Sequence, residues 1–460
     1  MNTHIKTILC ALCLCALTVA GMAACDQADT PADTDATTVT ESTPVTDSAE
    51  TEAEETTVET TAEETTEEGT TVWLPDVSMS DLSDIMQPIF MGNTVKNETV
   101  MFLDKGDVKQ LLYPIDSIVS VTNYMGTVTY REGIDYVVED GMLKVTEKSA
   151  IPCITRAKYL NVADTTLQTK FEGEIYNTYW GEGRLMTDWQ ICVTYTHSEA
   201  WGGFTQTSAA PTYEKLLRKL QAGEDVTIIF YGDSDTYGAC SSYMDNHKPY
   251  QPSFAMLTTY ALADLFDYTV HHVRYAERAD TAPIPSEDYV AGTRGTITYI
   301  NSSVGGWGSR DGITKFDSHV KPYAEEFGCD LLVIALGGND ATYPPRSVAH
   351  CIEVIGEKAL EVTPDTSLLI LATTMPNPDS IGWFVTQDRQ EEQFYGVAAK
   401  FVENGTPCAV ACMTSVSLAV MERKDYRDIT GNNINHPNDF TSRLYAQTMI
   451  QALIGYENMK

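Results

Sequence analysis

The sequence predicts an α/β protein whose parallel sheet is covered on both faces, preceded by a smaller β-sandwich. Short, continuous apolar runs in the second half of the chain predict buried parallel strands, and segments with helical spacing lie between them. These runs are Val226–Phe230, Leu331–Leu336 and Leu368–Ala372. In the first half, apolar and polar residues alternate with few helical stretches between, which is typical of a sandwich of antiparallel strands.

Residues 1–24 have the pattern of a signal peptide. Lys6 provides a positive start, Thr7–Ala20 is apolar, and small residues follow. The string Met22-Ala23-Ala24-Cys25 resembles a bacterial lipobox, although Leu is the usual residue where Met22 stands. We therefore predict lipidation of Cys25, with ordinary cleavage near Ala23 or Ala24 as the alternative.

Residues 25–72 predict a disordered tether. Between Asp26 and Val72 there are 15 Asp or Glu residues and no Lys or Arg, with almost nothing apolar to bury. Repulsion between like charges would keep such a segment extended, as a spacer between a folded unit and the cell envelope. The whole chain has 65 acidic and 30 basic residues, a net charge of −35, which argues against nucleic acid as a partner.

Residues 73–208 predict the β-sandwich. Glu139-Asp140-Gly141 separates two of its runs and is a hairpin signal. The predicted strands are Thr99–Leu103, Ile118–Thr122, Thr127–Tyr130, Asp135–Val138, Met142–Val145 and Trp189–Thr196. Trp180, Trp189 and Trp201 are candidates for a carbohydrate platform, and core or edge packing is an equally good interpretation.

Residues 209–460 predict the α/β domain, in which helices and strands alternate to the end of the chain. Besides the three apolar runs, Ile297–Ile300 is expected to be a strand. The expected helices are Tyr213–Leu220, Ser253–Phe266, Ile313–Phe327, Val348–Val362, Glu391–Val402 and Phe440–Leu453.

The cysteines predict neither a metal site nor a disulfide framework. Of the 11 in the chain, the seven that follow Cys25 are scattered, and no two of them have C-x-x-C spacing. An odd number cannot pair completely, and several lie in apolar runs, where a thiol behaves as a small hydrophobe. No cofactor or metal is expected.

Four segments at predicted strand ends carry the chemistry. Ser234 follows the first strand in Gly232-Asp233-Ser234, and Gly306 follows Ile297–Ile300. Asn339 stands in Gly337-Gly338-Asn339-Asp340, and His436 precedes the last helix. Loops at the carboxyl ends of parallel strands meet at one edge, where ligands bind. Ser234 is then a nucleophile, His436 its base, and Gly306 and Asn339 donors to an oxyanion, together with the backbone of Ser234.

This set resembles the SGNH hydrolases, also called GDSL-type esterases. The four residues that name the family correspond to Ser234, Gly306, Asn339 and His436, and the resemblance covers roughly the second half of the chain. It implies a flavodoxin-like sheet and hydrolysis of an ester. The family includes lipases, thioesterases and carbohydrate deacetylases, and a β-sandwich joined to such a domain is similar to some deacetylases that act on plant cell-wall polysaccharide.

One position departs from the family pattern. The resemblance implies an Asp three residues before the histidine, but Asn433 stands there. An amide can orient an imidazole but cannot neutralise an imidazolium, so the third member is either Asn433, a backbone carbonyl or another carboxylate such as Asp439. Asp233 and Asp340 are expected to support the loops.

These observations predict a cell-surface serine esterase that removes acetyl or other small acyl groups from a carbohydrate, with a polysaccharide as the expected substrate. The alternative is a carbohydrate-binding surface lipoprotein with a weak or inactive hydrolase domain, which the Asn433 position suggests.

Overall fold

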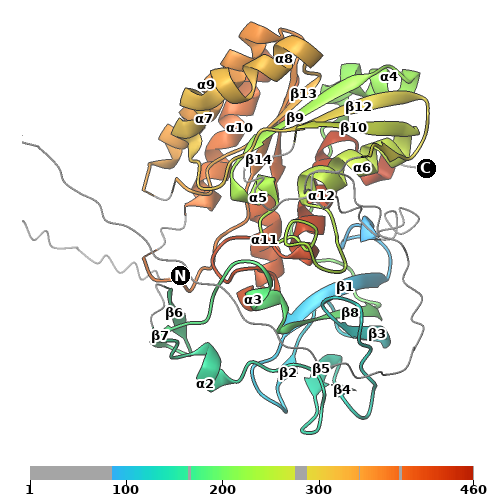
Figure 1. Cartoon of the computed structure of the whole chain (residues 1–460), viewed down its shortest axis with the longest axis vertical. Helices are drawn as coiled ribbons and strands as arrows, with labels where there is room; N and C mark the ends of the chain where they lie inside the picture. The colour runs from blue at the N-terminus through green and yellow to red at the C-terminus, as the bar shows by residue number, and fades with distance from the viewer. Residues whose placement is uncertain (1–84, 164–166, 275–286, 341, 383–385, 459–460) are drawn as a thin grey trace, which may run out of the picture. The chain divides into compact units, whose positions relative to one another are not determined.

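The computed structural model describes residues 85–163, 167–274, 287–340, 342–382 and 386–458 (Figure 1). The predicted signal peptide, Cys25 and the tether lie outside these residues and stay predictions. Among the helices of the described ranges, none is long and apolar enough to cross a membrane. We use the name N-terminal β region for the described residues up to 208, and parallel-sheet region for those from 209 onward.

The parallel-sheet region is built on seven described strands in the order β11-β10-β12-β9-β13-β14-β15. Neighbours pair in parallel, except that β11 is antiparallel to β10. The strands are β9 (Val226–Gly232), β10 (Tyr268–Arg274), β11 (Tyr289–Val290), β12 (Gly295–Asn301), β13 (Leu331–Ala335), β14 (Ser367–Ala372) and β15 (Cys408–Cys412). Without β10 and β11, which extend one edge, the order is the flavodoxin-like 2-1-3-4-5, whose switch point lies between β9 and β13.

The continuous apolar runs form the central strands because both faces of the sheet are covered. Every residue of β9, β13 and β14 is buried. Alternate residues of β9 enter different hydrophobic clusters: Ile229 belongs with Phe316, whereas Ile228 belongs with Phe254. A strand packed on two sides needs apolar residues at every position, which explains the unbroken pattern in the sequence.

Helices form a layer on each face of this sheet. Figure 1 shows α7 to α10 gathered on one side, and their buried residues share a single cluster. These helices are α7 (Ser309–His319), α8 (Lys321–Phe327), α9 (Pro345–Val362) and α10 (Gln387–Glu403). Residues of the other face come from α4 (Glu214–Ala222), α6 (Phe254–Phe266), α11 (Met413–Met421) and α12 (Asp439–Leu453). The short α5 (Ser234–Tyr237) follows β9.

The predicted elements of this region are present, with two differences. The single helix expected at Ile313–Phe327 is two helices, α7 and α8, which meet at Val320. Pro322 stands in the first turn of α8; a proline fits there because no N–H is needed, but inside a longer helix it removes a hydrogen bond. The strands β10, β11 and β15 and the helices α5 and α11 were not predicted.

The N-terminal β region consists of small antiparallel sheets. One has the order β1-β8-β3, another β2-β5-β4, and β6 pairs with β7. The strands are β1 (Thr94–Met101), β2 (Val108–Lys109), β3 (Ser117–Asn123), β4 (Tyr136–Glu139), β5 (Met142–Val145), β6 (Gln168–Phe171), β7 (Glu174–Asn177) and β8 (Gln190–Thr196). Two short helices, α2 (Arg156–Tyr159) and α3 (Arg184–Thr187), lie between them in sequence. The antiparallel character agrees with the sequence pattern, whereas the sandwich arrangement stays a prediction.

The two regions share one hydrophobic core and a set of buried polar contacts. Val100 and Ile191 of the N-terminal β region belong to the same cluster as Phe440 of α12. Lys424 pairs with Glu98 of β1 at 2.6 Å, and neither side chain has any exposed surface. The Asn438 amide donates to Thr99 Oγ1 and Gln190 Oε1, both at 3.0 Å. The segment that carries His436 is therefore fixed against the N-terminal β region.

Candidate active site

Ser234 is the first residue of α5, directly beyond the carboxyl end of β9. Gly232 is needed at this end because a Cβ there would lie 2.2 Å from Thr236 Oγ1 and 2.7 Å from the Ala335 carbonyl oxygen. The Asp233 carboxylate caps α5 by accepting the Asp235 N–H at 3.1 Å. Ser234 is thereby held in a tight loop, with 9% of its surface exposed.

The His436 imidazole meets this serine, with Nε2 2.9 Å from Ser234 Oγ. Its loop is closed by Asn432, whose side-chain oxygen accepts the N–H groups of Ile434, Asn435 and His436 at 2.9–3.0 Å. One amide oxygen thus fixes three successive residues of a segment that Pro437 keeps out of helix α12. The base is positioned by its own loop before any substrate is present.

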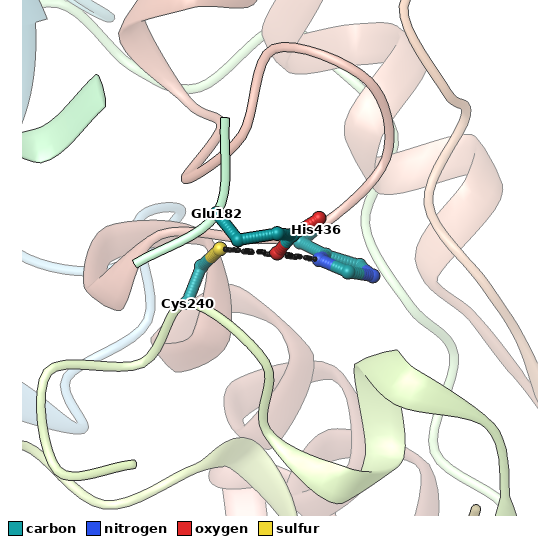
Figure 2. A group of neighbouring side chains, drawn as sticks. All are labelled: Glu182, Cys240 and His436. Atoms are coloured by element: carbon teal, nitrogen blue, oxygen red, sulfur yellow. Dashed lines mark hydrogen bonds and ion pairs between the residues drawn. The ribbon is translucent and has the colours of Figure 1, made fainter. Parts of the chain in front are cut away.

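The other imidazole nitrogen faces Glu182, which sequence reasoning missed. Glu182 lies between β7 and α3 in the N-terminal β region, and its Oε2 is 2.8 Å from His436 Nδ1. The same oxygen accepts the Cys240 thiol at 3.2 Å, as Figure 2 shows, while Oε1 accepts the Asn432 amide at 3.0 Å. Both carboxylate oxygens are therefore held, although 55% of the side chain is exposed.

The charges favour a carboxylate facing an imidazole that keeps its hydrogen on Nδ1. Burial alone would lower the pKa of His436, but the hydrogen bond and the charge of Glu182, with the nearby charges of Asp235 and Asp233, raise it. For Glu182, burial acts to raise the pKa, but the bond to His436 and its charge, with the donors Asn432 and Cys240, lower it to about 2. With its hydrogen on Nδ1, the ring presents the Nε2 lone pair to Ser234.

Asn433 does not have the position predicted for it. Its side-chain nitrogen donates to the Tyr159 hydroxyl at 3.0 Å and to the Tyr179 carbonyl at 2.8 Å, and the residue is fully buried with a φ of 68°. The expectation that Asn433 orients His436 is corrected, because Glu182 occupies Nδ1. Asn433 instead holds the segment that leads to Glu182, and Gly181 N–H donates to the Asn432 carbonyl beside it at 3.3 Å.

Asp439, the other candidate for the third member, also faces away from the histidine. Its Oδ1 accepts the Ser242 N–H at 2.9 Å, and its own N–H donates to the Tyr124 hydroxyl at 2.8 Å. Burial raises the pKa of this carboxyl. Asp439 thus joins the start of α12 to the segment after Cys240 and has no contact with His436 among the described hydrogen bonds.

Gly306 and Asn339 lie on the side of Ser234 where an oxyanion would form. Gly306 has a φ of +82°, which favours glycine, and a Cβ there would meet nothing within 4 Å. The Asn339 amide donates to the Trp307 carbonyl at 3.0 Å and to Asp233 Oδ2 at 3.3 Å. The longer bond is the weaker one, so it is the bond that an oxyanion would replace.

Asp340 supports this side of the site. Its carboxylate accepts the backbone N–H of Ser309 at 2.7 Å and the hydroxyl of the same residue at 2.9 Å. These bonds tie the end of β13 to the start of α7, and the loop that contains Gly306 leads directly into α7. The loop after β12 and the loop after β13 are thereby fixed relative to each other.

An open pocket of about 440 Å³ lies over Ser234. The parallel-sheet region and the N-terminal β region both line it: Leu167, Trp180, Glu182, Ser234, Gly305, Gly306, Asn339, Asn432, Ile434, Asn435 and His436. Of the three tryptophans singled out from the sequence, only Trp180 is in this lining. Trp189 lies under the Lys158 ammonium at 4.4 Å, and Trp201 packs edge-on against Tyr113, so the three do not form a shared platform at the pocket.

The chain is similar to known proteins in its structure, and no sequence match accompanies that similarity. No protein-family model and no curated protein sequence matches the chain. The chain is similar in structure to a two-domain esterase active on acetylated mannans, at 18% identity and a TM-score of 0.39. That match covers 55% of this chain and 54% of the esterase, about half of its length.

Two smaller proteins are matched over nearly all of their own length. An acetylxylan esterase from Geobacillus stearothermophilus is 11% identical, over 52% of this chain and 99% of its own, with a TM-score of 0.36. A GDSL-like lipase from Parabacteroides merdae ATCC 43184 is 15% identical, over 50% of this chain and 95% of its own, with a TM-score of 0.35. The four residues on which the resemblance to the SGNH, or GDSL-type, hydrolases rests, Ser234, Gly306, Asn339 and His436, all line one pocket in this structure.

Proposed function

We propose that this chain is a serine esterase that uses Ser234, His436 and Glu182 as its catalytic triad. The observation that carries the proposal is the continuous line of two hydrogen bonds, 2.9 Å from Ser234 Oγ to His436 Nε2 and 2.8 Å from His436 Nδ1 to Glu182 Oε2. A hydroxyl, a base and a group that orients the base are what acyl transfer needs. Glu182 also removes the reason for expecting a weak site, since a carboxylate does face the imidazole.

In the first half of the reaction Ser234 Oγ attacks the ester carbonyl carbon and His436 Nε2 takes its proton. The imidazolium then carries hydrogens on both nitrogens, and Glu182 stabilises it through Nδ1. Negative charge develops on the former carbonyl oxygen, near the backbone N–H groups of Ser234 and Gly306 and the amide of Asn339. His436 returns the proton to the departing alcohol oxygen as the bond to carbon breaks, which leaves an acyl group on Ser234.

The second half repeats these steps with water. His436 takes a proton from the water as its oxygen attacks the acyl carbon, and then gives it to Ser234 Oγ when that bond breaks. The acid is released and the free serine is restored. Because the pocket is open and no described residue closes it from above, the alcohol part of the ester is not limited to a small group.

We propose a carbohydrate as the alcohol part and acetyl or a similar small group as the acyl part. Trp180 supports the first choice, because a half-buried indole in the pocket lining offers a face on which a sugar ring can stack. Glu182, Asn339 and Asn435 add polar atoms to the lining, as recognition of hydroxyl groups requires. The same lining has few apolar side chains, Leu167 and Ile434 besides Trp180, which disfavours a long acyl chain.

The decisive experiment compares two esters on two variants. Ser234→Ala should abolish turnover of both p-nitrophenyl acetate and an acetylated oligosaccharide while the thermal unfolding temperature is kept. Trp180→Ala should lower kcat/KM for the oligosaccharide and leave it nearly unchanged for p-nitrophenyl acetate. Turnover that persists in Ser234→Ala would reject the serine mechanism, and equal losses on both esters would reject stacking by Trp180.

We also propose that the protein is a lipoprotein tethered to the bacterial surface through Cys25. The support is the apolar leader, the cysteine directly after two alanines, and the acidic segment of 15 carboxylates that follows. Cys25→Ser should move the protein from the membrane fraction to the soluble fraction of fractionated cells. An unchanged membrane fraction would reject attachment through this cysteine.

A further inference from the structure

Three metal-ligating atoms meet at the outer end of the triad. Glu182 Oε2 lies 2.8 Å from His436 Nδ1 and 3.2 Å from Cys240 Sγ, and Sγ is 3.9 Å from Nδ1. Figure 2 shows the three side chains converging from separate segments of the chain. No sequence motif predicts this group, because its members, residues 182, 240 and 436, are far apart in the chain. We call them the Glu–Cys–His cluster.

The donor set and its spacing fit a small divalent cation. Carboxylate oxygen, thiolate sulfur and imidazole nitrogen are the ligands of zinc sites. With Zn–N of about 2.0–2.1 Å and Zn–S of about 2.3 Å, neighbouring ligands of a tetrahedral ion are ~3.3–3.6 Å apart. The three observed separations lie on either side of that range, so shifts below 1 Å would close the site.

The surroundings favour a cation and give it a way in. The carboxyl of Asp235 lies near His436, and that of Asp245 lies near both Glu182 and His436; burial raises their pKa values to about 6 and about 7, so they carry charge at and above neutral pH. The Asn432 amide holds the second oxygen of Glu182, which is the type of outer support that orients metal ligands. Because 55% of the Glu182 side chain is exposed, an ion can reach the cluster and a water molecule can complete its coordination.

We propose that the Glu–Cys–His cluster binds one thiophilic divalent cation, with Zn²⁺ as the reference ion, and that the bound ion reversibly inhibits the esterase. In the metal-free structure Cys240 donates its thiol hydrogen to Glu182. Binding releases that proton to solvent; the imidazole loses its hydrogen from Nδ1 and takes one up from solvent on Nε2, so the ring stays neutral. The ion then forms bonds to Sγ, Oε2 and Nδ1, and no electron is transferred. The inhibitory half rests on the proposed function, and the binding half does not.

Inhibition follows from where the imidazole hydrogen goes. A neutral imidazole bound through Nδ1 carries its single hydrogen on Nε2. That N–H would donate to Ser234 Oγ, whereas catalysis needs the Nε2 lone pair to accept the serine proton. Glu182, now bound to the ion, no longer orients the ring. The ion would thus switch off the base without entering the pocket above Ser234.

The test begins with the binding half, on the chain after removal of its leader, freed of metal with a chelator. Addition of Co²⁺ should give a thiolate-to-cobalt charge-transfer band with one ion bound per chain. The band should persist in Ser234→Ala, which lacks the nucleophile but keeps the ligands, and vanish in Cys240→Ala. The matched control is Cys153→Ala, because Cys153 is a half-buried thiol outside the cluster and all seven described cysteines are free.

The inhibitory half uses Zn²⁺ and turnover of p-nitrophenyl acetate, with each variant compared with its own metal-free rate. Inhibition should be reversed by a chelator and weakened at least about 10-fold in Cys240→Ala, since even outer-shell partners of a metal cost 10–100-fold in affinity. Cys240→Ser replaces the thiol by a hydroxyl that can still donate to Glu182, so it controls for a folding defect in Cys240→Ala. Because it lacks the sulfur ligand, it should also weaken inhibition. A cobalt band that survives Cys240→Ala, or no binding by the wild type, would overturn the site. Binding without inhibition would overturn only the switch, and absent turnover with intact binding would overturn the proposed function.

Discussion

The parallel-sheet region and the N-terminal β region contribute to the site in different ways. Ser234 and Asn339 follow β9 and β13, neighbouring strands at the switch point of a fully buried sheet, so the fold itself brings them together. Glu182 lies in a loop between β7 and α3, each of four residues, and depends on hydrogen bonds from Asn432 and Cys240 to reach His436. The proposed nucleophile is thus positioned by the core, and the carboxylate by the docking of two regions.

The largest effect is expected for Glu182→Gln, which tests the contribution of the N-terminal β region to the site. A neutral amide cannot stabilise the imidazolium, and in serine proteases the equivalent change costs about 10⁴-fold in turnover. We expect a fall in kcat of that order with little change in KM, measured with p-nitrophenyl acetate in the presence of a chelator. Since Glu182 raises the pKa of His436, its loss should also move the acidic limb of the rate profile to lower pH.

Glu182→Asp serves as the control, because it keeps the charge but shortens the side chain. Its kcat should lie between those of Glu182→Gln and the wild type. If Glu182→Gln lost less than about 10-fold, the site would work as a Ser–His dyad, and the N-terminal β region would have no part in the chemistry.

The next test breaks the contact between the regions at Lys424. Removing one member of a fully buried ion pair leaves the other charged and unpaired, which costs about 3–5 kcal/mol. Lys424→Met should lower the free energy of unfolding by this amount in urea, because Glu98 stays buried. The double variant Lys424→Met/Glu98→Met should recover part of the loss.

Lys400→Met is the matched control for that experiment. Lys400 pairs with Glu353 at 2.8 Å on the outer helices, where 59% of the lysine side chain is exposed. Such a pair contributes about 0–1 kcal/mol. Similar losses for the two lysine variants would show that the buried pair does not hold the regions together.

Asn339→Ala tests the side of the site that the parallel sheet provides. Removal of one oxyanion donor lowers turnover by about 10²–10³-fold. We expect that loss in kcat and an unchanged KM, because the donor matters once negative charge has developed. A change confined to KM would mean that Asn339 only holds substrate, in line with its bond to the Trp307 carbonyl.

The smallest expected effect is that of Asn433→Asp, the change that would restore the family carboxylate. In this chain the position faces the Tyr179 carbonyl and the Tyr159 hydroxyl, so the aspartate loses the donor to that carbonyl and brings charge into a fully buried site. Loss of a buried hydrogen bond costs about 1–3 kcal/mol. Unfolding should occur at lower urea concentration and kcat should fall; a rise in kcat would show that Asn433 lies closer to His436 than it does here.

Part of the fold and of the site could be predicted from the sequence alone. The central strands β9, β13 and β14 were predictable because burial on both faces leaves unbroken apolar runs. Ser234, Gly306 and Asn339 were found because such strands end at one edge. His436 was found from its place before the last helix and from the resemblance to the family, although its loop depends on Asn432, which the sequence did not single out. The break between α7 and α8 was missed because helical spacing continues across Pro322.

Glu182 was beyond the reach of local reasoning. It is separated from His436 by 254 residues, and Gly181-Glu182-Gly183 has no feature that distinguishes it from any polar loop. One indirect indication was present in the sequence: Asn433 stands where the family has the aspartate of its triad, so the carboxylate had to come from elsewhere in the chain. The candidates for that position were Asn433 itself, a backbone carbonyl, or another carboxylate such as Asp439, which is close in sequence to His436. The carboxylate that faces the imidazole comes instead from a region whose docking could not be inferred from periodicity.

In the proposed esterase, reliance on Glu182 would also make the rate of hydrolysis sensitive to partial unfolding. Segments held by few buried contacts open at lower free energy than a protein's core, and the Glu182 loop is half-exposed and anchored by hydrogen bonds. On warming, the carboxylate can leave the imidazole while β9 and β13 keep Ser234 and Asn339 in place. Activity would then decline before the near-ultraviolet signal of the buried aromatic residues changes, and the rate of hydrolysis would report the attachment of the two regions to one another.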